Sequence, residues 1–293
     1  MGRSHLLCEV WPRHAAPLEM TSVAYAGGAG AHSAAAAERL FPFASALVGV
    51  DTFADVIEAT VEGEVSYGVL PIESSLAGPV NETHDLLYET PVSIVAETSI
   101  PIRHHLVARE PLTLDDIRVV KSHPVAFEQC RELLRSLTGV KAIATATTAE
   151  AAAEVAESTE PGEAAIVGER ALRLHPLHAV ARDVGDHPEA YTRFVSLATH
   201  TRIDRVHMDW RTAFSFVTDH RSGALHHAIE PFARHEIDLV QLVSRPIPKS
   251  PWRYRFDAVL AGHPLEAETQ GSLAECRQRV RQLRVFGSYP AGV

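Results

Sequence analysis

The sequence predicts an α/β protein of two lobes with a cleft between them, followed by a smaller βαββαβ unit. Three observations lead to this fold class. Residues 22–203 alternate short apolar runs with amphipathic stretches, the pattern of α/β proteins. Polar or glycine-rich loops follow several predicted strands, and ligand clefts form at such positions. After Arg205 the order changes to strand, helix, two strands, helix and strand, as in a ferredoxin-like sandwich.

The first elements follow from hydrophobic spacing and helix-end signals. Residues 22–25 are an apolar run that ends in a glycine-rich loop, and residues 34–40 have helical spacing. Residues 51–62 form a second helix, because their apolar side chains share one face. Asp51 is the predicted N-cap of this helix and Gly63 its end.

The remaining elements of the two lobes are shorter. A strand at 65–70 is broken by Pro71 and leads into a polar loop. A helix begins near Pro124, where proline suits the first turn, and His123 is expected to cap the loop before it. The other predicted elements are strands at 92–96, 105–108, 119–120, 142–146, 164–167 and 179–182, and a helix at 149–157.

The second unit has the length of a small module. Its predicted elements are strands at 211–218, 237–244 and 252–260, helices at 223–235 and around Leu273 to Leu283, and a last strand from Val285. Apolar residues alternate along the strand at 252–260, so that strand packs one face against a core. Such a unit is too small to hold both an active site and a large core of its own.

Composition excludes several functions. The formal net charge of −10 disfavours a nucleic-acid partner. No apolar run approaches the roughly 20 residues that cross a bilayer, so no membrane partner is expected. Three widely spaced cysteines indicate a reducing, cytoplasmic compartment, and the 17 histidines form no metal motif. Residues 1–20 lack the apolar core of a signal peptide and are predicted to be a loose tail, with Met20 as an alternative start.

Five segments, in order along the chain, carry a family resemblance. Residues 67–75 read Tyr-Gly-Val-Leu-Pro-Ile-Glu-Ser-Ser, and Gly-Pro-Val-Asn-Glu-Thr follows at 78–83. The other segments are the glycine-rich loop at 27–33, Ser-His-Pro to Gln-Cys at 122–130, Thr-Thr-Ala-Glu-Ala-Ala at 147–152, and Thr192-Arg193-Phe194. Together they resemble the prephenate dehydratase family. The second unit resembles the ACT domain that is fused to these enzymes.

The resemblance implies both an architecture and a reaction. It implies a two-lobed, periplasmic-binding-protein-like catalytic domain at 21–203 and a ferredoxin-like ACT regulatory domain at 209–288. The reaction is the loss of water and carbon dioxide from prephenate to give phenylpyruvate, in phenylalanine biosynthesis. Aromatisation drives this reaction, so no cofactor is expected. A homodimer or homotetramer is expected from the resemblance alone.

The catalytic residues implied by the resemblance are Thr192, Arg193 and Phe194. Thr192 would donate a hydrogen bond to the leaving hydroxyl, a role typically worth about 10²–10⁴ in rate. Arg193 would hold a substrate carboxylate with two parallel bonds, or would form an internal salt bridge with Glu73. Phe194 would shape the cavity beside the ring, or would simply be part of the core.

The resemblance also implies substrate contacts from polar loops. The residues are Gly30, Ser33, Glu73, Ser74, Ser75, Asn81, Thr147 and Thr148. Some of them begin helices, whose free amides bind carboxylates. N-capping is the alternative role for the serine and threonine hydroxyls. In the ACT unit, phenylalanine would bind near Gly223, Ala224, Leu225, Ser244 and Arg245.

The sequence departs from the family pattern at several of these places. Ala31 lacks the hydroxyl, and His32 replaces the aromatic residue, of the family's first loop. Ser74 replaces an asparagine, and Val243 stands where the ACT signature has a glutamate. His226 follows the Gly-Ala-Leu element. These changes predict altered specificity or turnover, and weakened feedback by phenylalanine.

Three functions therefore stay open at the level of sequence. The first is dehydration of prephenate, with arogenate as a related substrate. The second is decarboxylation of prephenate without aromatisation, against which the retained Thr192 argues. The third is a catalytically silent regulator that binds an amino acid.

Overall fold

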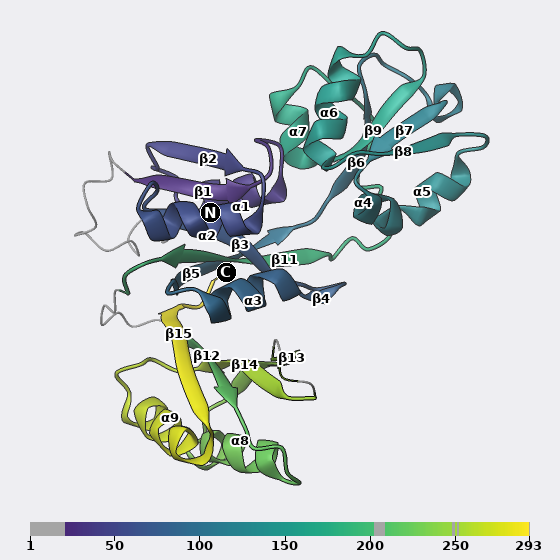
Figure 1. Ribbon diagram of the computed structural model, residues 1–293. Coiled ribbons are helices and arrows are strands. Elements are labelled where there is room, and N and C mark those ends of the chain that lie inside the picture. The colour runs from purple at the N-terminus through teal and green to yellow at the C-terminus, as the bar shows by residue number, and fades with distance from the viewer. Residues whose placement is uncertain (1–20, 202–208, 248–249, 251, 293) are drawn as a thin grey trace, which may run out of the picture.

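The computed structural model describes residues 21–201, 209–247, 250 and 252–292. These residues form three separate β-sheets, each with helices packed on it, and so confirm a mixed α/β fold (Figure 1). The tail predicted at 1–20 lies outside the described residues. No helix in the described part of the chain is long and apolar enough to span a membrane.

The first lobe is built on the sheet β2-β1-β3-β11-β5, with β4 paired to β3. Its strands are β1 (Ser22–Ala26), β2 (Ala46–Val50), β3 (Tyr67–Ser74), β4 (Gly78–Pro79), β5 (Ser93–Pro101) and β11 (Tyr191–Ala198). Its helices are α1 (His32–Leu40), α2 (Phe53–Glu62) and α3 (Asn81–Glu89). β1 runs parallel to β2 and β3, whereas β11 is antiparallel to both of its neighbours. After the second lobe, the chain thus re-enters the first sheet as strand β11, between β3 and β5.

The second lobe is built on the sheet β10-β6-β9-β7-β8. Its strands are β6 (His104–Ala108), β7 (Val119–Ser122), β8 (Lys141–Ala144), β9 (Glu163–Gly168) and β10 (His178–Ala181). Its helices are α4 (Pro124–Gln129), α5 (Arg131–Ser136), α6 (Thr148–Glu157) and α7 (Glu169–Leu174), with the short 3-10 helix η3 (Leu114–Asp116). The chain passes between the two lobes twice, at 102–103 and at 182–190. His123 caps α4 as predicted, because its Nδ1 accepts the amide hydrogen of Val125 at 3.2 Å.

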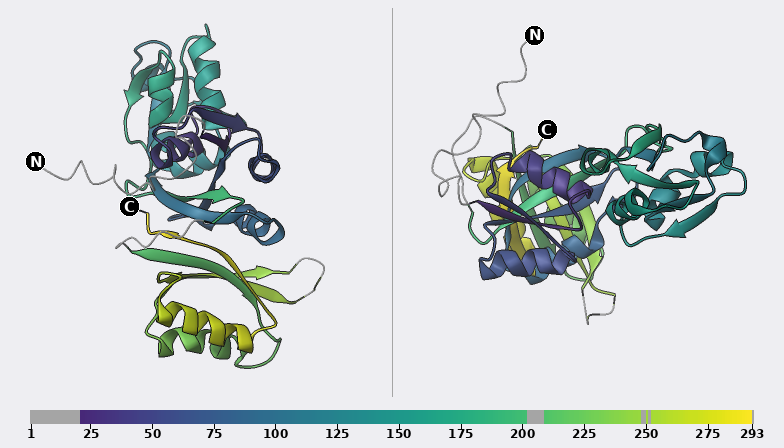
Figure 2. Two further views of the ribbon diagram at one scale, coloured as in Figure 1. Left: turned by 90° about the vertical axis from the view of Figure 1, so that its left-hand side faces the viewer. Right: turned by 90° about the horizontal axis from the view of Figure 1, so that it is seen from above.

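The third unit has the predicted order βαββαβ. Its elements are β12 (Trp210–Val217), α8 (Ala224–Arg234), β13 (Leu239–Pro246), β14 (Tyr254–Ala261), α9 (Ala267–Arg279) and β15 (Gln282–Pro290), and its sheet has the order β13-β14-β12-β15. Both helices cover the face of this sheet that points away from the first lobe (Figures 1 and 2). The other face of the sheet packs on the first lobe.

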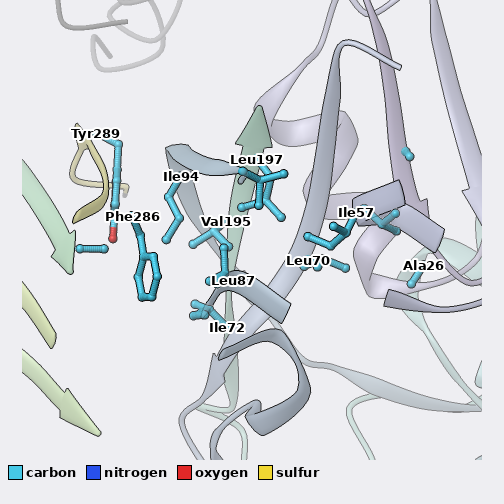
Figure 3. Packing of buried hydrophobic residues seen from close by; sticks show 14 of the residues in the cluster. Ala26, Ile57, Leu70, Ile72, Leu87, Ile94, Val195, Leu197, Phe286 and Tyr289 are labelled. Atoms are coloured by element: carbon cyan, nitrogen blue, oxygen red, sulfur yellow. The ribbon is translucent and has the colours of Figure 1, made fainter. Parts of the chain in front are cut away.

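One hydrophobic cluster joins the first lobe to the third unit. It contains Val195 and Leu197 of β11 together with Phe286 and Tyr289 of β15, all of them buried. Figure 3 shows Phe286 and Tyr289 beside Ile94 of the first lobe. Because this cluster is continuous, the first lobe and the third unit share a core.

Two predicted strand and helix ends are wrong. Strand β3 continues through Pro71 to Ser74. Its pairing with β11 shifts register beside Pro71, and a bulge tolerates a residue without an amide hydrogen. Helix α2 is capped by Thr52, whose side chain accepts the amide hydrogen of Asp55, and Asp51 is not the cap.

The structure also contains helices and strands that the sequence did not predict. Strands β2 and β11 and helix α3 were not expected from hydrophobic spacing. Asn81 therefore begins a helix and is not part of the predicted polar loop. Helix α9 ends at Arg279, so Val280 lies just beyond it.

Candidate active site

A cleft of about 460 Å³ lies between the first and second lobes. The first lobe contributes Gly30, Ala31 and His32 at the start of α1, and Ile100 at the end of β5. The remaining lining residues include Arg103, His105, Gly168, Glu169, Arg170, Arg173, Arg182 and Asp183. Both crossings between the lobes thus border the cleft, as expected for a two-lobed binding fold.

The glycine-rich loop brings the two lobes into contact. A methyl group added at Gly30 would come within 3.2 Å of the Cβ of Ala149, in the first turn of α6. Nε of Arg170 donates to the carbonyl oxygen of Ala29 at 2.5 Å, and the same guanidinium pairs with Glu38. A larger residue at position 30 would therefore crowd Ala149, where the two lobes pack closely.

The start of α1 offers backbone donors. Ala31 is the N-cap residue of α1, and no side chain caps this end. The first amides of an uncapped helix attract anions. Ser33 is buried in the first turn of α1, and Gly30 lines the cleft.

Electrostatics in the cleft are dominated by arginine. Arg103 forms an ion pair with Asp183 at 3.1 Å, and Glu169 lies 2.8 Å from Nε2 of His105. The four lining arginines outnumber the two lining carboxylates. In a chain of net charge −10, this local excess of cations favours an anionic ligand in the cleft.

His32 lies where the two lobes meet. Burial and the neighbouring His104 lower the pKa of His32 to about 4, so its ring is neutral at pH 7. The two imidazole centroids are 6.2 Å apart in an edge-on arrangement. A methyl group at Gly168 would lie 3.1 Å from Nε2 of His32, so Gly168 provides the space for this ring.

Strand β11 carries Thr192 next to the cleft. Thr192 is paired with Ile100, which lines the cleft, and on its other side with Ser74. Ser75 is tied to the same strand, because its hydroxyl accepts the amide hydrogen of Tyr191 at 2.9 Å. The hydroxyl of Ser74 accepts the amide hydrogens of Leu76 and Ala77. The structure thus brings Ser74 and Ser75 together with Thr192.

Arg193 lies on the opposite face of β11. Successive strand residues point to opposite sides, so Thr192 shares the face of Phe194, which packs in the cluster under α1. Arg193 shares the other face with Val195 and lines a small cavity of about 20 Å³ toward the third unit. Its guanidinium pairs with Glu73 at 3.1 Å, as in the internal salt bridge considered from sequence.

The other predicted substrate ligands do not line the cleft. Among the described residues, Gly30 is the one predicted substrate-binding residue in its lining. Thr147 caps α6 by accepting the amide hydrogen of Glu150, and Thr148 is the first residue of that helix. Asn81 is exposed at the start of α3. Substrate contacts by these residues, and the catalytic roles of residues 192–194, stay predictions.

Sequence reasoning missed the cleft arginines. The available signal was that a single arginine in a cleft is informative when the whole chain is acidic. Sequence alone could not select the four that line the cleft from the other arginines of the chain. No cluster of three or more histidine, cysteine or acidic residues suited to a metal ion occurs in the part of the chain that the structure describes.

The predicted effector residues gather at one end of the third sheet. Arg255 of β14 is paired both with Val217, the last residue of β12, and with Arg245 of β13. Gly223 caps α8 a few residues after β12, next to Ala224 and Leu225. Ser244 precedes Arg245 on β13, and it is exposed. An effector site at this end of the sheet stays a prediction.

An ionic cluster that is buried at Arg255 and Asp257 and partly exposed at Asp85 connects the third sheet to α3. The guanidinium of Arg255 donates to Asp85 at 2.7 Å and to Asp257 at 3.2 Å. Nδ1 of His84 lies 3.1 Å from the second oxygen of Asp257. Arg245 also pairs with Asp85, at 2.6 Å. The sheet that carries the predicted effector site is thereby bonded to the first lobe.

Comparison with known proteins identifies the family. The family described as prephenate dehydratase matches residues 23–202, which contain both lobes. The chain belongs to the prephenate dehydratase family. The chain is 34% identical over 277 residues to an arogenate dehydratase/prephenate dehydratase 2 of Arabidopsis thaliana, a chloroplastic protein. This match covers 92% of the chain and 72% of that relative.

Solved structures support the same fold for this family member. A prephenate dehydratase from Arthrobacter aurescens, in complex with L-Phe, matches with a TM-score of 0.83 and 27% identity, covering 92% of this chain and 90% of that one. A protein described as GqqA, a novel type of quorum quenching acylases, matches with a TM-score of 0.82 and 29% identity. That match covers 92% of this chain and 97% of the other one. Both matches extend over the lobes and the third unit together.

Proposed function

We propose that the chain is a lyase that converts prephenate to phenylpyruvate, with loss of water and carbon dioxide, in phenylalanine biosynthesis. The observation that carries the proposal is a cleft lined by four arginines beside the strand that holds Thr192. The substrate carries two carboxylates, which suit guanidinium groups and the uncapped start of α1. The family match at 23–202 supports the same reaction.

In this mechanism the cleft positions the substrate and Thr192 assists departure of the hydroxyl. Formation of the aromatic ring supplies the driving force, so the protein needs only to orient the substrate and to hydrogen-bond the leaving oxygen. The Thr192 hydroxyl is on the α1 face of β11, the face that adjoins the cleft. Because His32 is neutral, the lining arginines supply the positive charge of the cleft beside the start of α1.

Product identification tests this function. The purified chain is incubated with prephenate, and the product is examined in alkali, where phenylpyruvate absorbs as an enol. We expect phenylpyruvate. A non-aromatic product would instead support the decarboxylase, and absence of turnover would support the catalytically silent regulator.

We further propose that residues 21–203 are the catalytic domain and 209–288 an ACT regulatory domain that senses phenylalanine. Support comes from the βαββαβ order and from the similar dehydratase described in complex with L-Phe. Weakened feedback is expected, because Val243 replaces a glutamate of the ACT signature. Turnover is measured with added phenylalanine, tyrosine and tryptophan, and strong inhibition at physiological concentrations would contradict weakened feedback. A cytoplasmic location and a homodimer or homotetramer complete the proposal.

A further inference from the structure

Two arginines of the cleft have no acidic partner in the part of the chain that the structure describes. Arg103 is paired with Asp183, and Arg170 is paired with Glu38. Among the described residues, no carboxylate lies within ion-pair distance of Arg173, on α7, or of Arg182, after β10. Both side chains belong to the second lobe and line the same cleft as the glycine-rich loop of the first lobe. Two cations are therefore free to meet a ligand there.

Both acidic residues of the cleft are already engaged. Asp183 is held by Arg103 at 3.1 Å. Nδ1 of His105 accepts the backbone amide hydrogen of Asp183 at 3.1 Å, and Nε2 of the same ring lies 2.8 Å from Glu169. Each of the two lining carboxylates therefore already has a partner at one oxygen, which a ligand ammonium group would have to share.

We propose that Arg173 and Arg182 are the carboxylate-binding pair of the cleft and make it select a keto dicarboxylate over the corresponding amino acid. This inference rests on the proposed function. In terms of that reaction, the cleft would select prephenate over arogenate, in which an amino group replaces the ketone. Both substrates present carboxylates to the two guanidinium groups. The ammonium group of arogenate meets a surplus of cations, and both lining carboxylates already have a partner, so its lost hydration is only partly replaced.

The proposal is tested by steady-state kinetics with both substrates. The variants are Arg173→Gln, Arg182→Gln and the double variant, with Arg277→Gln on the exposed side of α9 as the matched control. Each cleft variant should raise KM for prephenate by about ten- to a hundredfold, the usual effect of removing a charged hydrogen bond, while changing kcat much less. The wild type should prefer prephenate by about tenfold or more in kcat/KM, since one unpaired charge has an effect of at least this size.

The double variant should lose most of this preference. Removing the arginines weakens binding of both substrates but also removes repulsion of the arogenate ammonium, so arogenate loses less. Arg173→Lys and Arg182→Lys should restore part of the affinity, because they restore charge without the planar fork. Thermal unfolding of each variant, together with the Arg277→Gln control, separates a binding effect from a loss of fold.

Three outcomes would overturn the proposal. These are a wild type that uses arogenate as well as prephenate, a double variant with unchanged KM, and a control variant that behaves like the cleft variants. If neither substrate is turned over, the proposed function fails, and calorimetric titration with prephenate then decides the inference. Binding by the wild type that is lost in the double variant would support the arginine pair, whereas equal binding or no binding by the wild type would refute it.

Discussion

Thr192 and Arg193 are neighbours in sequence, but their side chains lie on opposite faces of β11. Thr192 adjoins the cleft through its partner Ile100, and Arg193 faces the third unit. A single strand therefore carries one side chain toward the proposed substrate and the next toward the shared core. Residues that are consecutive in a motif need not act on the same ligand, and each has to be tested by itself.

Replacing Thr192 by alanine should lower kcat by about 10²–10⁴, because the leaving hydroxyl loses its hydrogen-bond donor. Thr192→Ser should keep most of the activity, since serine retains the hydroxyl. The measurement is kcat for prephenate with phenylpyruvate as the product. Thr199→Ala, at an exposed position just after β11, is the matched control. An alanine variant at position 192 with wild-type kcat would rule out the donor role.

Arg193→Met should change KM for prephenate by less than about twofold, because a residue that does not bind the substrate leaves KM nearly unchanged. The half-exposed ion pair with Glu73 should make this variant less stable by about 1 kcal/mol or less. Glu73→Gln removes the same pair from the other side and should lower the free energy of unfolding by a similar amount. A rise in KM of about tenfold or more would instead show that Arg193 holds a substrate carboxylate.

At the scale of elements, local signals in the sequence located most helices and strands but not all of their ends. Helix α2 shows why. Asp51 and Thr52 are both good N-cap residues, and spacing alone does not choose between them. The structure selects Thr52, because Asp55 can then return a hydrogen bond to the Thr52 amide at 2.9 Å and complete a capping box.

Thr52→Ala should therefore destabilise the protein by about 1 kcal/mol, the usual effect of losing an N-cap. Asp51→Ala, one residue earlier, should change the free energy of unfolding by less than about 0.5 kcal/mol, as at ordinary surface sites. Denaturant unfolding of the two variants measures both values. The reverse ranking would mean that Asp51 is the cap in solution.

The elements that were missed have weak local signals for different reasons. Strand β2 is a run of five apolar or glycine residues that is short and lies at the largely exposed edge of its sheet, and α3 begins with the polar residues Asn81 and Glu82. Strand β3 runs through Pro71 because its bulge against β11 tolerates proline, and that pairing joins segments over a hundred residues apart. The family resemblance of residues 192–194 implied a substrate role for Thr192, and the structure pairs it with Ile100 of the cleft. The sequence could not place Arg173 and Arg182 there, because long-range packing determines which arginines meet.

At the scale of the whole molecule, buried charges join the third sheet to the first lobe. Arg255 is 1% exposed, and it bonds Asp257 on its own strand and Asp85 on α3. Its guanidinium also lies 4.4 Å from the centre of the Tyr88 ring. Since these contacts continue the shared hydrophobic cluster, the first lobe and the third unit should unfold together.

Arg255→Met should destabilise the protein by about 3–5 kcal/mol, because Asp257 would then be buried opposite only His84. Arg277→Met, on the exposed side of α9, should have an effect within about 0.5 kcal/mol. Calorimetry of the whole chain gives both values and shows whether one transition or two occur. A small loss with two separate transitions in the wild type would show that the cluster does not couple the two units.

The junction of the lobes should make stability depend on pH. The pKa of His32 is about 4 in the folded chain, against 6.5 for an unperturbed histidine, because burial and His104 disfavour its charged form. The unfolded chain therefore binds a proton at a higher pH than the folded chain. The free energy of unfolding should then fall as pH falls from about 6.5 to about 4, and His32 should contribute no further change below that range.

His32→Phe should flatten this part of the stability curve, because phenylalanine cannot take up a proton in the unfolded chain. His220→Phe makes the same change at an exposed position and should leave the slope as in the wild type. Urea unfolding at a series of pH values between 4 and 7.5 gives the slope for each protein. Carboxylates that titrate near pH 4 affect all three proteins alike, so the difference between the curves isolates His32. Equal slopes for His32→Phe and the wild type would show that His32 is charged, or exposed, when the lobes are folded.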